Sequence, residues 1–246
     1  MKTKSIILFL IFLYNFTSAY GQEGKTQNKI SNWYNTNEYA LLKDYFNFLS
    51  IPNTFNDRER LDDNARFIAD LMARSGIQAE LLYDKDKKSA PVVYGEVNIP
   101  GAEKTIIFYA HYDGQPVNPA NWAPGLDPFR PQLLTDRLDR NGVFLNFPDP
   151  GESFNPDWRI YGRASADDKA GVFAILMAYE AIRATGQQPK VNIRFFFEGE
   201  EENGSVNLEE ILENNKNKLK ADLWVICDGP MPASGKSRSH SECGGM

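Results

Sequence analysis

The sequence predicts an α/β domain with a largely parallel sheet. Strand-like and helix-like segments alternate along the chain, which is typical of parallel sheets covered by helices. Residues 105–110 are a near-continuous apolar run, as expected of a strand buried on both faces, and the largely apolar runs 191–197 and 221–227 are also predicted to be buried strands. Each of these runs is followed within a few residues by side chains that can bind a metal. The predicted fold therefore has a candidate site at one edge of its sheet.

The other elements follow from hydrophobic period and from Gly and Pro punctuation. Residues 78–83, 91–98 and 159–161 are further predicted strands. Helices are predicted at residues 39–49, 58–74, 168–184 and 208–219. The long segment 115–158 is rich in proline and aromatic residues, and we expect it to be functional or to hold a small sheet of its own.

The N-terminus has the pattern of a secretory signal. Basic residues precede the apolar run 6–16, and the small residues Ala19 and Gly21 follow it. We expect residues 1–21 to be a signal peptide and residues 22–40 to be a loose leader. The protein is then secreted or periplasmic and has no stable membrane anchor. The alternative is that the apolar run stays attached as an anchor, although it is short for a bilayer span.

Composition narrows the classes of partner and site. The formal net charge of −6 gives no basic footprint, so we expect no nucleic-acid partner. Cys227 and Cys243 have neither metal-site nor disulfide spacing. His111 and His240 are the only histidines, so a metal site would depend mainly on carboxylates.

The first candidate is the pair His111 and Asp113, directly after the strand predicted at 105–110. Residues i and i+2 of a strand share a face. A metal-bound imidazole usually donates its other N–H to a carboxylate. His111 as a ligand and Asp113 as the group that orients it are therefore a coherent pair. A His-x-Asp sequence on its own is more often ordinary loop chemistry.

The second candidate is the pair Asp167 and Asp168 at the start of the predicted helix. The helix dipole and a capping box with Ser165 as N-cap account for Asp168. Asp167 is then free to act as a ligand. The alternative is that both acids serve only the helix terminus.

The remaining candidates are Glu201, Glu202 and Asp228, which follow the last two strands. A solvated acidic run and an Asx-type turn are their ordinary interpretations. The first fits poorly, because the strand at 191–197 should be central. Adjacent glutamates can divide two roles, one binding metal and the other acting as a general base for water.

Charge balance favours two metal ions. Asp167, Glu202 and Asp228 bring three negative charges, which two divalent cations and a bridging hydroxide would neutralise. A single divalent ion balances them less well. Mixed histidine and carboxylate ligation suits Zn²⁺ first and Mn²⁺ second.

Four motifs, in this order, resemble a known family: YAHYDGQPV, YGRASADDKAG, FFFEGEEENGS and VICDGP. The family is that of the co-catalytic metallopeptidases of the carnosinase, glutamate carboxypeptidase and aminoacylase type, and the dipeptidase branch is the most similar. The resemblance covers roughly residues 40 to 230. It implies a three-layer α/β sandwich with a central mixed, mostly parallel sheet. It also implies a pair of zinc ions, small peptide substrates and, for full-length members, a homodimer.

The resemblance also implies roles by position. The metal ligands would be His111, Asp167, Glu202 and Asp228. Asp167 would bridge the two ions. Asp113 would steady His111, and Glu201 would be the general base that passes a proton from water to the leaving amine. The chain would then hydrolyse amide bonds in small peptides, as a dipeptidase or carboxypeptidase.

The sequence departs from the family pattern in several places. Ala164 and Ala170 replace glycines. We expect the catalytic domain, residues 41–230, to be incomplete at its C-terminus. A truncated tail at 231–246 stands where the family has a lid or dimerisation domain and then a further ligating histidine. His240 is a poor substitute, because no regular element would hold it.

Two other functions stay open at this point. One is that the chain is an inactive truncated fragment, and the other is that it is a calcium-stabilised binding module that catalyses no reaction. The second alternative requires oxygen ligands only and predicts that His111 lies away from the carboxylates.

Overall fold

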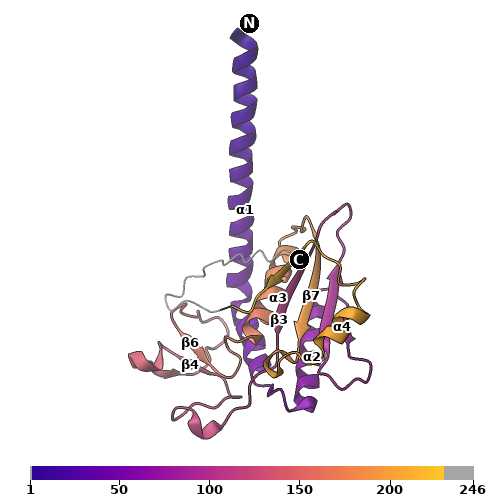
Figure 1. The fold of residues 1–246 in the computed structure, drawn as a ribbon. Helices are drawn as coiled ribbons and strands as arrows, with labels where there is room; N and C mark the ends of the chain where they lie inside the picture. Colours follow the sequence, from indigo (N-terminus) through magenta and orange to yellow (C-terminus); the bar gives the residue numbers. More distant parts are fainter. Residues whose placement is uncertain (1, 230–246) are drawn as a thin grey trace.

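A five-stranded mixed sheet organises the computed structural model (Figure 1). The model describes residues 2–229, with side chains from residue 24 onwards. The strands of the sheet are β1 (Ala79–Leu82), β2 (Val92–Val97), β3 (Thr105–His111), β7 (Asn192–Glu198) and β8 (Leu223–Ile226). Their spatial order is β1-β2-β7-β3-β8. The β1–β2 and β2–β7 pairs are antiparallel, whereas β7–β3 and β3–β8 are parallel. The sheet is thus mixed as expected, but its parallel part is confined to three strands.

Helices cover both faces of this sheet. α1 (Lys2–Leu49), α2 (Arg58–Arg74) and α3 (Lys169–Ala184) share one hydrophobic cluster with the sheet, and α4 (Leu208–Asn214) belongs to a second. Consecutive residues of β7 divide between the two clusters: Phe195 and Phe197 join the first, and Phe196 joins the second. This alternation follows from the two-residue period of a strand. It confirms the three-layer sandwich.

The long segment between β3 and α3 builds a second, smaller sheet. β4 (Gln132–Leu134) pairs antiparallel with both β5 (Phe144–Leu145) and β6 (Arg159–Tyr161). Two short 3₁₀ helices, η1 (Pro119–Asn121) and η2 (Leu138–Arg140), lie in the same segment. The expectation of a small sheet within residues 115–158 is therefore met, with β6 following directly and leading towards α3.

The N-terminal region differs from the expected loose leader. Residues 22–40 belong to the single helix α1, whose N-terminal part extends away from the rest of the chain (Figure 1). The helical spacing of Trp33 and Leu41 explains part of this difference, because Trp33 packs against the core that contains Leu41. The polar composition of the segment concealed this period. Among the described residues, no helix is both long and apolar enough to cross a bilayer.

The predictions for the C-terminal tail, residues 231–246, and for His240 concern residues outside the described part of the chain. The other predicted elements are present with shifts of a few residues at their ends. The largest shift is in α4, which ends at Asn214, whereas the pattern predicted a helix to residue 219. α4 is followed by hydrogen-bonded turns that still bury Leu219.

The core predicts a large effect for a cavity-forming substitution in α3. Leu176 is fully buried between α3 and the sheet, so Leu176→Ala should lower the free energy of unfolding by about 2–5 kcal/mol. The same change at Leu138, which is 37% exposed, should cost much less and serves as the control. Chemical denaturation of both variants measures the difference. Equal losses would contradict the packing described here.

Candidate metal centre

His111 occupies the centre of the parallel part of the sheet. It is the last residue of β3, has an exposed fraction of 0%, and pairs with Glu198 of β7. The backbone that follows is held closely, since Tyr112 N donates to Glu198 O at 2.8 Å. The phenol of Tyr112 approaches Gly199 so closely that a side chain at this position would collide with it. These contacts hold the backbone next to His111, and with it the imidazole ring, at the carboxyl edge of the sheet.

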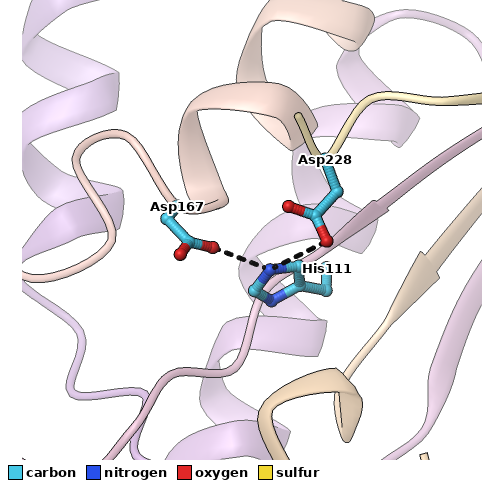
Figure 2. Close-up of side chains that lie close together, drawn as sticks. All are labelled: His111, Asp167 and Asp228. Atoms are coloured by element: carbon cyan, nitrogen blue, oxygen red, sulfur yellow. Dashed lines mark hydrogen bonds and ion pairs between the residues drawn. The ribbon is translucent and has the colours of Figure 1, made fainter. Parts of the chain in front are cut away.

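Three side chains from separate parts of the chain meet at this edge (Figure 2). They are His111 at the end of β3, Asp167 before α3 and Asp228 after β8, and we call them the ligand group. Their potential ligand atoms all lie within 4.8 Å of one another. His111 Nε2 is 2.9 Å from Asp167 Oδ1 and 3.9 Å from Asp228 Oδ2. The sequence predicted this convergence.

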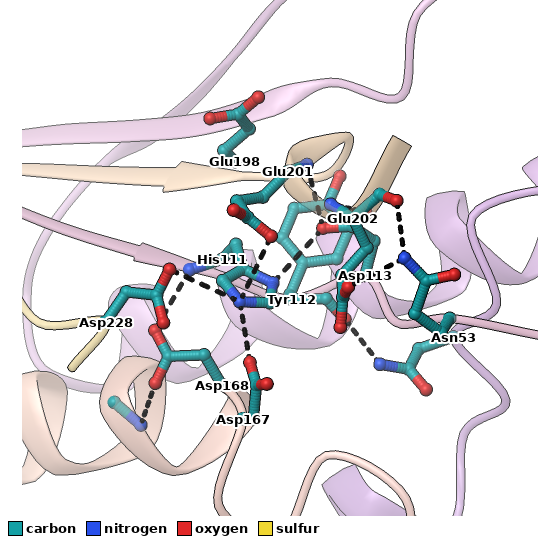
Figure 3. Close-up of polar contacts among 12 residues, drawn as sticks. Asn53, His111, Tyr112, Asp113, Asp167, Asp168, Glu198, Glu201, Glu202 and Asp228 are labelled. Atoms are coloured by element: carbon teal, nitrogen blue, oxygen red, sulfur yellow. Dashed lines mark hydrogen bonds and ion pairs between the residues drawn. The ribbon is translucent and has the colours of Figure 1, made fainter. Parts of the chain in front are cut away.

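Asp113 connects His111 with the turn that carries Glu201 and Glu202, which we call the glutamate turn (Figure 3). Its carboxylate is fully buried and accepts hydrogen bonds from Glu201 N at 3.2 Å and Glu202 N at 3.0 Å. Asp113 Oδ1 is also 3.3 Å from His111 Nδ1, although this contact lacks the alignment of a hydrogen bond. Asp113 thus lies beside His111 Nδ1, where its role of orienting the ring stays a prediction, and its carboxylate fixes the turn that carries both glutamates. Sequence reasoning missed this second contact.

The two adjacent glutamates lie differently. Glu201 and Glu202 belong to the 3₁₀ helix η3 (Glu201–Asn203) directly after β7. Glu201 Oε2 approaches His111 Nε2 to 3.7 Å, at the rim of the ligand group. Glu202 Oε2 instead accepts a hydrogen bond from Gln115 Nε2 at 3.0 Å, and Glu202 is not among the three residues of the ligand group. Its role as a ligand stays a prediction.

Asp168 has a larger structural part than expected. It is itself the N-cap of α3, and its Oδ1 accepts a hydrogen bond from Gly171 N at 3.1 Å. The expectation that Ser165 caps the helix was wrong, because the helix begins only at Lys169. Asp168 Oδ2 also accepts from His111 N at 3.2 Å, which ties the start of α3 to the end of β3. A side chain on Gly171 would collide with this carboxylate.

The site concentrates negative charge in a partly buried place. Burial lowers the pKa of His111, but Asp113, Asp168 and Asp228 outweigh it and raise this pKa to about 9. Burial raises the pKa of Asp168 to about 7, against the lowering effect of His111. Burial also raises the pKa of Glu201, and the neighbouring carboxylates of Asp228 and Glu202 add to this. The carboxylates therefore stabilise positive charge at the ring.

Lys169 is a site residue that sequence reasoning missed. It is fully buried although it carries an amine, and its Nζ donates to Phe48 O and Ile51 O. A signal was present in the sequence. Lys169 lies three, four and seven residues before Val172, Phe173 and Leu176, which all face the core.

The ligand group fits a divalent cation. One imidazole and two carboxylates are the donor types that zinc and manganese accept. The calcium-module alternative predicted that His111 lies away from the carboxylates. His111 lies among them, which contradicts that alternative.

A separate cavity of about 660 Å³ lies between α1 and the small sheet. Tyr34, Phe154 and Trp158 line it, and it includes no residue of the ligand group.

Comparisons with known proteins identify the family. Residues 107–240, more than half of the chain, match the model of peptidase family M20/M25/M40. The chain belongs to this family. It is 34% identical over 140 residues to the Beta-Ala-His dipeptidase of Homo sapiens, covering 56% of the chain and 23% of that protein. It is 25% identical over 192 residues to the Cys-Gly metallodipeptidase of Saccharomyces cerevisiae, covering 73% and 36%.

Solved structures show the same architecture. Human carnosine dipeptidase 1 aligns with a TM-score of 0.64 and 26% identity, over 82% of this chain and 41% of that one. An M20 family metallo-carboxypeptidase from Sulfolobus solfataricus aligns with a TM-score of 0.62 and 32% identity, over 80% and 39%. The chain thus spans less than half the length of the relatives it matches.

The contacts of Asp113 predict a defined defect for Asp113→Asn. The amide would present N–H groups towards the backbone N–H donors of Glu201 or Glu202, or towards the ring of His111. We expect the affinity for Zn²⁺ to fall by about 10–100-fold, as for other residues that orient metal ligands. Titration calorimetry measures it, with Asp86→Asn as the control, because Asp86 is exposed and bonds Lys88. An unchanged dissociation constant would contradict the orienting role.

Proposed function

We propose that this chain supplies the metal-binding and base-bearing part of a metal-dependent peptidase for small peptides. The observation that carries the proposal is the ligand group: one buried imidazole and two carboxylates with ligand atoms within 4.8 Å. Membership of peptidase family M20/M25/M40 supports hydrolysis of amide bonds. The similarity to two dipeptidases and a carboxypeptidase supports small peptides as the substrates.

The proposed cofactor is a pair of divalent ions, zinc first and manganese second. His111, Asp167 and Asp228 would hold the first ion, with Asp167 shared between both. Glu202 would contribute to the second ion after its carboxylate turns away from Gln115. Bound ions of this kind polarise a carbonyl oxygen and make water acidic enough to attack at neutral pH.

Glu201 is the proposed general base. Its carboxylate lies at the rim of the ligand group, 3.7 Å from His111 Nε2, and Asp113 anchors its backbone. It would accept a proton from the attacking water and donate it to the leaving amine. Asp113 would keep His111 and the glutamate turn in fixed relative positions during the reaction.

The homodimer expected for full-length family members is part of the same proposal.

Substituting the base separates chemistry from metal binding. Glu201→Gln keeps the size of the side chain but removes its basicity, so turnover should fall by about 10²–10⁴-fold. The bound zinc per chain should not change. Hydrolysis of β-alanyl-histidine and cysteinyl-glycine with added Zn²⁺ or Mn²⁺ measures turnover, and elemental analysis measures the metal.

Each other outcome has a definite meaning. A parallel loss of metal would show that Glu201 is a ligand and that its proposed division of roles with Glu202 is wrong. Unchanged turnover would exclude Glu201 as the base. Metal binding without turnover in the unsubstituted chain would support the inactive-fragment alternative. Glu209→Gln is a matched control, because Glu209 lies on α4 and faces solvent.

We also propose that the chain is exported. The support is the basic start, the apolar run at residues 6–16 and the small residues Ala19 and Gly21. Mass spectrometry of the protein recovered from its native source should find a mature N-terminus at Gln22. A mature protein that keeps residues 1–21 would contradict cleavage.

A further inference from the structure

Lys169 is a buried lysine without a carboxylate partner among its described contacts. Its Nζ donates hydrogen bonds to Phe48 O at 2.8 Å and to Ile51 O at 2.7 Å. The same atom lies 4.6 Å from the centre of the Phe48 ring. Burial of such a side chain is costly unless its donors are satisfied. Phe48 lies in the last turn of α1 and Ile51 follows its end, so the cost is offset only while this end of α1 and α3 stay in contact.

The end of α1 benefits from this contact as well. The last carbonyl groups of a helix have no partner within the helix and need donors from elsewhere. Lys169 supplies one for Phe48, and cationic side chains are favoured at a helix C-terminus. A contact between residues more than 110 positions apart therefore satisfies groups on both helices.

Tyr45 makes a second connection from α1 to the same segment. Its hydroxyl donates to Ser165 O at 3.0 Å, and its ring packs 5.1 Å from the ring of Phe173. Ser165 lies two residues before Asp167, and Lys169 lies two residues after it. The two connections therefore hold the backbone on both sides of one member of the ligand group.

Asp167 needs such support because its own side chain is 69% exposed. Its one described hydrogen-bond contact is with His111 Nε2, the atom to which a metal would bind. Once that atom binds metal, the position of the Asp167 carboxylate depends on its backbone. Asp168 anchors this backbone to β3, and the contacts of Tyr45 and Lys169 anchor it to the end of α1.

We propose that Lys169 and Tyr45 are positioning residues for metal binding: they clamp the segment around Asp167 against the end of α1. This inference rests on the proposed function, since it assumes that Asp167 is a ligand. It makes residues 45–51 part of the construction of the site, although none of them lies in the ligand group.

Two substitutions test the clamp. Lys169→Met keeps a long apolar stem and removes the donors, and Tyr45→Phe removes only the hydroxyl. The controls are Lys218→Met and Tyr94→Phe. Like Lys169, Lys218 lies over an aromatic ring, which is that of Tyr94, and like Tyr45, Tyr94 donates its hydroxyl to a backbone carbonyl. Tyr94 belongs to the cluster on the other face of the sheet.

Zinc titration calorimetry of the folded chains is the measurement, at a temperature below every unfolding transition of the metal-free proteins. The zinc dissociation constant should rise about 10–100-fold for Lys169→Met and about tenfold for Tyr45→Phe. Both controls should stay within about twofold, because substitutions distant from the ligands leave their geometry unchanged. A purely structural role would lower the unfolding temperature without changing the affinity of the folded chain.

The outcomes are distinguishable. Dissociation constants within about twofold of the unsubstituted chain for both variants would overturn the clamp and leave the metal site intact. If Lys169→Met does not fold, the result for Tyr45→Phe alone decides. If the unsubstituted chain binds no zinc, the proposed function fails, and the inference fails with it.

Discussion

The attraction between one buried imidazole and the carboxylates around it is the constraint on which this structure depends. Asp113 approaches His111 from one side, and Asp167 and Asp228 approach its Nε2 atom from the other. Glu201 adds a further negative charge nearby. Carboxylates placed this close repel each other unless a positive charge lies between them. A proton on His111 supplies some of it, and divalent cations would supply more.

The fold brings these charges together through ordinary means. Parallel strands end at a common edge, so His111 at the end of β3 and Asp228 after β8 become neighbours despite their distance in the chain. Backbone hydrogen bonds then fix the loops: Asp113 holds the glutamate turn, and Asp168 holds the start of α3 against β3. The loops around the site are thus held in place by the buried carboxylates of Asp113 and Asp168, which accept hydrogen bonds from backbone N–H groups and do not belong to the ligand group. The exposed acids are left free for ligation.

Much of this arrangement could be predicted from the sequence, and the exceptions have physical causes. The apolar runs located β3, β7 and β8, and the polar residues after β3 and β8 and before α3 located the ligand group. The antiparallel pairing of β1 and β2 was not predictable, because strand direction depends on how the chain crosses the sheet. The helix over residues 22–40 was missed because its sparse apolar residues are diluted by polar ones. The contacts of Asp113 and Lys169 with distant backbone groups depend on tertiary geometry, which a local pattern does not record.

The most direct test of the account is anomalous X-ray diffraction at the zinc absorption edge, from crystals of the chain grown with zinc. The account predicts an anomalous peak about 2.0–2.2 Å from His111 Nε2 and from one oxygen each of Asp167 and Asp228. A second peak sharing Asp167 would support the paired site. Ordered zinc elsewhere, with these three side chains unligated, would contradict the central claim.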